Sequence, residues 1–190
     1  MQTSGSIPDR NLRRIKRSHA NYSRFMNEHS LEDEPAVLHC ALELRVEGDY
    51  CRGLVRNNAD DRVLFDECVS TRGLIASLRG NTQEPVMTCS CTVPECAGFY
   101  DQESRLSEHS VHWSLRYNGE DLDLLFDRNA YENAALSVLR HFRDHPWNSC
   151  EFGMVPYEYD GFEDFVQVID ELLCNCPQLA EVWNHQTQAK

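Results

Sequence analysis

The sequence predicts an α+β fold, in which helices pack on one face of an antiparallel sheet and a basic helix is added at the N-terminus. Three observations support this prediction. Apolar and polar residues alternate over 38–46, which is the period-two pattern of a half-buried strand. The same alternation runs through 111–126 on both sides of a turn, and apolar residues recur with helical spacing over 162–173. Strands that precede helices along the chain favour α+β over an alternating α/β arrangement.

The N-terminal residues differ in charge from the rest, so we divide the 190-residue chain into a basic segment at 1–34 and one α+β domain at 35–190. Residues 1–30 hold six arginine or lysine side chains but only two carboxylates. Apolar residues from Leu12 to Met26 recur with helical spacing, which predicts an amphipathic helix. This helix either packs its apolar stripe on the acidic domain or forms a basic arm that contacts nucleic acid.

The first half of the domain is expected to contain three strands and a short helix. Gly48-Asp49 turns the chain between the first two strands, and the helix ends near Gly80. The expected elements are strands at 38–46, 50–55 and 62–67 and a helix at 71–78.

A hairpin is expected around Asn118-Gly119, because these residues readily adopt the positive φ angles of a type I′ turn. Its inward face carries large apolar side chains, so we assign it to the core. Two helices follow the hairpin. Asn129 and Glu132 have the spacing of a capping box, so a helix begins there and is stopped by Pro146. The helix over 162–173 ends at Pro177, or resumes there as a last turn.

The nine cysteines are an odd number, and no apolar segment typical of secretion precedes the domain. Both features argue for reduced thiols and a cytoplasmic protein. No apolar run approaches the roughly 20 residues of a membrane-spanning helix. The sequence therefore predicts a protein that does not bind membranes.

Cys89, Cys91 and Cys96 fall within eight residues that are interrupted by Pro94 and closed by Gly98. Thiolates bind Zn²⁺ tetrahedrally at about 2.3 Å, and three of them so close in sequence can share one ion. This spacing predicts a structural zinc site, although it is not the common C-x₂-C pattern. The candidates for a fourth ligand are His109, His112, Cys174 and Cys176.

Three other interpretations of the cysteines stay open. The segment can be a tight turn that holds no metal. The Cys89/Cys91 pair, like Cys174/Cys176, can cycle through a disulfide. Finally, the cluster can be the centre of a metal-dependent or thiol enzyme, although the sequence contains no P-loop, G-x-S-x-G or H-E-x-x-H motif.

The stretch from Met87 to Tyr131 resembles a group of uncharacterised bacterial proteins. The resemblance rests on the C-x-C-x₄-C-A-G turn, the strand containing Val111-His112-Trp113, and Phe126-Asp127-Arg128 leading to Tyr131 at a helix start. It covers about a quarter of the chain. It implies a bacterial α+β domain and implies no activity.

The charge favours a binding protein over an enzyme. The formal net charge is −13 although the N-terminal segment is basic, so the acidic excess lies on the domain. Such a domain repels nucleic acid and attracts a basic protein partner. We therefore expect a non-enzymatic, acidic protein-binding module, such as an immunity or inhibitor protein that neutralises a basic toxin. Nucleic acid is expected only at the N-terminal segment.

Overall fold

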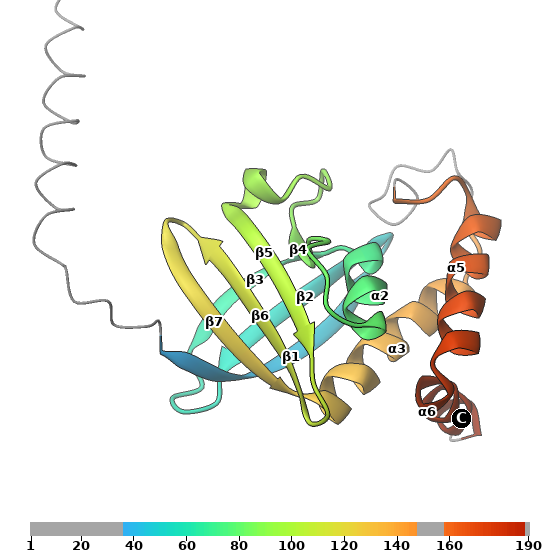
Figure 1. Cartoon of the computed structure of the whole chain (residues 1–190). Coiled ribbons are helices and arrows are strands. Elements are labelled where there is room, and N and C mark those ends of the chain that lie inside the picture. The colour runs from blue at the N-terminus through green and yellow to red at the C-terminus, as the bar shows by residue number, and fades with distance from the viewer. Residues whose placement is uncertain (1–35, 148–157, 189–190) are drawn as a thin grey trace, which may run out of the picture. The chain divides into compact units, whose positions relative to one another are not determined.

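The computed structural model describes residues 36–147 and 158–188 (Figure 1). These residues form one seven-stranded sheet in the order β4-β3-β2-β1-β7-β6-β5, together with four α-helices and a short 3₁₀ helix. The strands are β1 (Val37–Glu47), β2 (Tyr50–Asn57), β3 (Val63–Val69), β4 (Met87–Thr88), β5 (Phe99–Leu106), β6 (Ser110–Tyr117) and β7 (Glu120–Asp127). The helices are α2 (Thr71–Arg79), η1 (Pro94–Ala97), α3 (Arg128–Asp144), α5 (Phe162–Asn175) and α6 (Pro177–Gln188).

The sheet has two antiparallel halves joined by one parallel pair. β1, β2 and β3 form a meander with β4 beside β3, and β5, β6 and β7 form the second meander. β1 and β7 meet in parallel at the centre, with Leu38 opposite Leu124 and Cys40 opposite Phe126. The α+β class predicted from the sequence is confirmed, but the sheet is mostly rather than wholly antiparallel.

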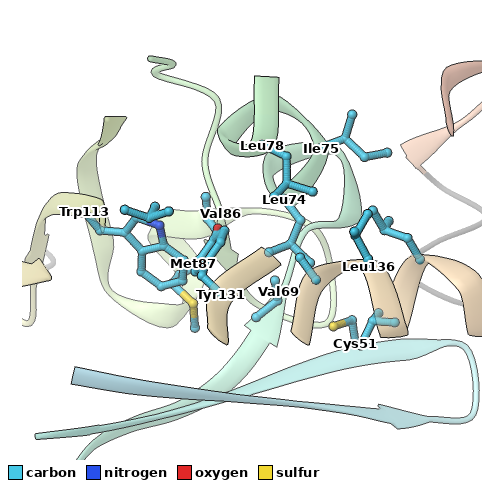
Figure 2. Packing of buried hydrophobic residues seen from close by; sticks show 14 of the residues in the cluster. Cys51, Val69, Leu74, Ile75, Leu78, Val86, Met87, Trp113, Tyr131 and Leu136 are labelled. Atoms are coloured by element: carbon cyan, nitrogen blue, oxygen red, sulfur yellow. The ribbon is translucent and has the colours of Figure 1, made fainter. Parts of the chain in front are cut away.

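The core lies between the sheet and helices α2 and α3 (Figure 2). The ring of Trp113 on β6 lies 4.6 Å from that of Phe126 on β7 and 5.7 Å from that of Tyr131 on α3, measured between centroids. The Tyr131 hydroxyl is 2.7 Å from the Ser77 hydroxyl on α2, so one side chain links the sheet to both helices. Burial raises the pKa of Tyr131, and the phenol stays neutral as a hydrogen-bonding group.

The two edges of the sheet approach each other. The ring of Phe65 on β3 packs edge-on against that of Phe99 on β5, with centroids 5.3 Å apart. Gln102 on β5 reaches the backbone of Met87 on β4: its amide nitrogen donates to the Met87 carbonyl at 2.7 Å, and its amide oxygen accepts from the Met87 N–H at 2.8 Å. β4 is therefore held on one side by β3 and on the other by this side chain.

The start of α3 differs from the sequence prediction. Asp127 is its N-cap and accepts a hydrogen bond from the Ala130 N–H at 2.8 Å. The predicted capping box at Asn129 and Glu132 is wrong, because the chain passes from β7 directly into the helix. Glu132 instead accepts from Arg128 at 2.6 Å in a largely buried ion pair.

The two C-terminal helices cover the other side of α3 (Figure 1). α5 occupies the predicted position, and the last turn expected after Pro177 is a complete helix, α6. The Arg140 guanidinium on α3 lies 4.5 Å from the ring centroid of Trp183 on α6 and donates a hydrogen bond to the Trp183 carbonyl.

The predicted basic N-terminal helix falls outside the described residues. None of the helices within 36–147 and 158–188 combines the length and the apolar character needed to cross a membrane.

Candidate metal centre

The predicted cysteine turn directly follows β4. The Thr92 N–H donates to the Cys89 carbonyl at 3.0 Å, which folds residues 89–92 into a tight turn. Thr92 has a φ of 65°, a conformation that a β-branched residue rarely adopts. In this turn the Cys91 N–H points at the Cys89 sulfur, with 3.2 Å between nitrogen and sulfur. The backbone therefore brings the first two cysteines together.

The third cysteine is placed by η1, which Pro94 begins and Gly98 ends. Gly98 has a φ of 82°, and its N–H caps the short helix by donating to the Glu95 carbonyl at 3.1 Å. Its carbonyl accepts from the Asn118 N–H at 3.0 Å, and an added Cβ would lie 2.5 Å from the Asn118 side-chain oxygen. Glycine is required here, and the contact ties Cys96 to the tip of the β6–β7 hairpin.

The sulfur atoms of Cys89, Cys91 and Cys96 all lie within 4.8 Å of one another, close enough to hold a metal ion. Cys91 and Cys96 are exposed and Cys89 is half-buried, so the cluster is open to solvent. The sulfurs of Cys89 and Cys91 are bonded to each other as a disulfide, whereas Cys96 is a free thiol. Because a metal needs thiolates, the cluster can bind one only when this disulfide is reduced.

The histidines suggested as further ligands lie elsewhere. His109 is in the turn at the far end of β5. At about 3.3 Å per residue, the length of β5 places this turn roughly 20 Å from the cysteines. It is exposed and lies beside Glu108, at 3.9 Å. His112 is on β6, with its Nε2 atom 3.1 Å from a carboxylate oxygen of Asp123 on β7. The structure does not bring either histidine to the three sulfurs.

The other two candidate ligands, Cys174 and Cys176, lie at the C-terminal end of α5. Within the described part of the chain, no fourth histidine, cysteine or carboxylate ligand joins the three sulfurs at the same mutual distance. Once the disulfide is reduced, the cluster would supply three soft ligands and leave one position of a tetrahedral ion to water or to another molecule.

A pocket of about 210 Å³ adjoins the cysteine turn. The residues that line it include Arg72, Thr88, Thr92 and Glu158. The Glu158 carboxylate lies at the N-terminus of α2, where it accepts from the Thr71 hydroxyl at 2.5 Å and from the Arg72 N–H at 3.2 Å. Burial raises the pKa of Glu158, while these hydrogen bonds lower it in part.

The acidic stretch that contains Glu158 is typical of an exposed face, so the sequence pattern did not distinguish this carboxylate from its solvated neighbours. Nothing in the local pattern around Glu158 marks it as buried. The hydroxyl of Thr88, which also lines the pocket, is buried and has no hydrogen-bond partner among the described residues. The pocket therefore brings a buried carboxylate and a buried hydroxyl close to the cysteine turn.

No protein-family model matches this chain, and it has no significant match among curated proteins or solved structures.

Proposed function

We propose that this protein binds a soft metal ion, with reduced Cys89, Cys91 and Cys96 holding one Zn²⁺. The observation that supports this proposal is the convergence of three sulfurs within 4.8 Å on a turn anchored at both ends. Thiolates are soft ligands that favour Zn²⁺ or Cu⁺ over Mg²⁺ or Ca²⁺. The exposure of Cys91 and Cys96 gives the ion a direct route to the site.

The rest of the domain does not depend on the metal for its core. The buried cluster between the sheet and the helices contains none of the three cysteines. We therefore propose a functional or regulatory metal rather than one that folds the domain. A metal-dependent enzyme is the second candidate, since a catalytic zinc also has three protein ligands and one open position. The buried Glu158 in the adjoining pocket favours that candidate.

Metal analysis tests the site. Protein kept reduced and purified without chelators or an affinity tag is expected to contain about one zinc per chain. Cys91→Ser removes one of three ligands and is expected to lower the zinc content severalfold, with little change in the free energy of unfolding. Cys174 is an exposed cysteine outside the cluster. The variant Cys174→Ser is therefore the matched control and should retain the metal. Fully reduced protein that contains no zinc, and takes none up, would contradict the proposal.

We further propose that the acidic domain binds a basic protein partner, in the manner of an immunity or inhibitor protein. The support is the formal net charge of −13 on a chain whose first 30 residues are basic. An acidic surface speeds association with a basic partner through electrostatic attraction. The same surface repels the phosphates of nucleic acid. The open position on the metal offers such a partner one additional point of contact.

Salt dependence tests the partner proposal. The full chain, used as bait in a lysate of its native cell, is expected to recover a basic protein in stoichiometric amount. Their association rate should fall by about tenfold or more between low and physiological ionic strength, because salt screens the attraction. A neutral protein of similar size measures the background. Recovery of no such partner, or a rate indifferent to salt, would count against this function.

A further inference from the structure

We propose that the cysteine turn is a redox-gated metal site, in which oxidation closes the Cys89–Cys91 disulfide and releases the ion. This inference rests on the proposed metal-binding function and adds its regulation. The structure holds the disulfide state of the turn, with Cys96 left as a thiol beside it. Reduction of this one bond turns the same three residues into three soft ligands.

Local geometry favours this disulfide over the two other pairings within the cluster. Cys89 and Cys91 are separated by one residue, and the backbone turn that joins them is already closed by the Thr92 N–H. Cys96 belongs to η1, whose position is set by Gly98 and its contact with Asn118. The first two sulfurs can therefore bond without movement of the elements that carry the third.

The reaction needs a two-electron oxidant, and we assign this role to a peroxide. The thiolate of Cys89 or Cys91 attacks one peroxide oxygen, the O–O bond breaks, hydroxide leaves, and the attacking cysteine becomes a sulfenic acid. The other thiolate then attacks the sulfenic sulfur, forms the S–S bond and displaces a second hydroxide. Two thiolates have lost two electrons, which the peroxide has gained. Two equivalents of a small thiol reverse the change and are themselves oxidised to a disulfide.

Loss of the metal follows from the number of ligands that remain. Disulfide sulfurs carry no thiolate charge, so oxidation leaves Cys96 as the one thiolate of the cluster. The described residues offer no fourth ligand that could compensate. We therefore expect the dissociation constant for zinc to rise by at least about 100-fold on oxidation.

The experiment starts from the reduced full chain loaded with Zn²⁺, which is treated with hydrogen peroxide. Released zinc is followed with a chromogenic chelator, free thiols are counted, and disulfides are located by peptide mass spectrometry. We expect zinc release in step with the loss of two thiols and the appearance of the Cys89–Cys91 disulfide. Dithiothreitol should restore both thiols and zinc binding. Cys174→Ser is expected to behave like the unmodified chain.

Two kinds of failure are distinguishable. If the reduced chain takes up no zinc before peroxide is added, the proposed metal site itself is wrong, and the gate fails with it. If zinc binds but stays bound after the Cys89–Cys91 disulfide has formed, the metal site stands and the gate is wrong. Zinc release that accompanies a different disulfide, or sulfinic acid alone, would equally overturn the gate.

Discussion

Gly73→Ala is expected to destabilise the domain by about 3 kcal/mol or more. A Cβ at this position of α2 would lie 2.0 Å from the Pro85 carbonyl oxygen and 2.8 Å from the Val86 Cα. Both neighbours are backbone atoms, so the helix or the incoming strand must move. The segment leads straight into β4 and Cys89.

The expected change in the free energy of unfolding for Gly73→Ala is opposite in sign to the change expected from helix propensity. Helix propensity alone predicts that alanine in place of glycine stabilises a helix by roughly 0.5–1 kcal/mol. Chemical denaturation measures the free energy of unfolding of both proteins. Ala76→Gly, at a half-buried position of the same helix, is the control and should cost only about 1 kcal/mol. A Gly73→Ala protein as stable as the unmodified chain would show that α2 does not contact residues 85–86 as described.

Gln102→Ala is expected to have the second large effect, a loss of roughly 2–5 kcal/mol. The side chain satisfies both the N–H and the carbonyl of Met87, which is completely buried. Without it, two buried backbone groups lose their partners, and β4 keeps only its pairing with β3. Cys89 directly follows β4, so loss of the bridge also removes support from the start of the cysteine turn. The variant should therefore bind zinc more weakly than the unmodified chain, even under conditions in which both proteins are fully folded.

Two controls separate the bridge from a general surface effect. Glu103→Ala, at the neighbouring position, removes an exposed ion pair with Arg105 and should cost less than about 1 kcal/mol. Gln102→Glu keeps an acceptor for the Met87 N–H but places a second acceptor against the Met87 carbonyl, so it should not restore the stability lost in Gln102→Ala. Thermal or urea unfolding gives the comparison. Equal stability for Gln102→Ala and Glu103→Ala would rule out the bridge.

The parts of the fold predicted from sequence are those with a strong local signal. The Asn118-Gly119 turn and the regular alternation on either side predicted the β6–β7 hairpin, since neighbouring strands and their turn specify each other. β5 escaped prediction because a register shift between Tyr100 and Glu103, with Asp101 at a φ of 50°, disrupts its alternation. The parallel β1–β7 pair joins segments about 85 residues apart, and no local pattern specifies such a contact.

The residues of the candidate site likewise separate into those that a local sequence pattern indicated and those that it did not. Cys89, Cys91 and Cys96 are close in sequence, so their spacing alone indicated that the sulfurs could meet. His109 and His112 are almost as near in sequence, but β5 carries the chain away from the cysteines before reaching them. Glu158 lies far from α2 in sequence and is buried by packing against it. Long-range packing of this kind leaves no signature in a single sequence.

The most direct test of the metal site is zinc X-ray absorption on the reduced, metal-loaded full chain. We predict three sulfur ligands at about 2.3 Å and one oxygen or nitrogen ligand at about 2.0–2.1 Å. Cys96→Ser should reduce the sulfur count by one, and Cys174→Ser should leave it unchanged. A zinc shell made of nitrogen and oxygen alone would contradict the assignment of the metal to Cys89, Cys91 and Cys96.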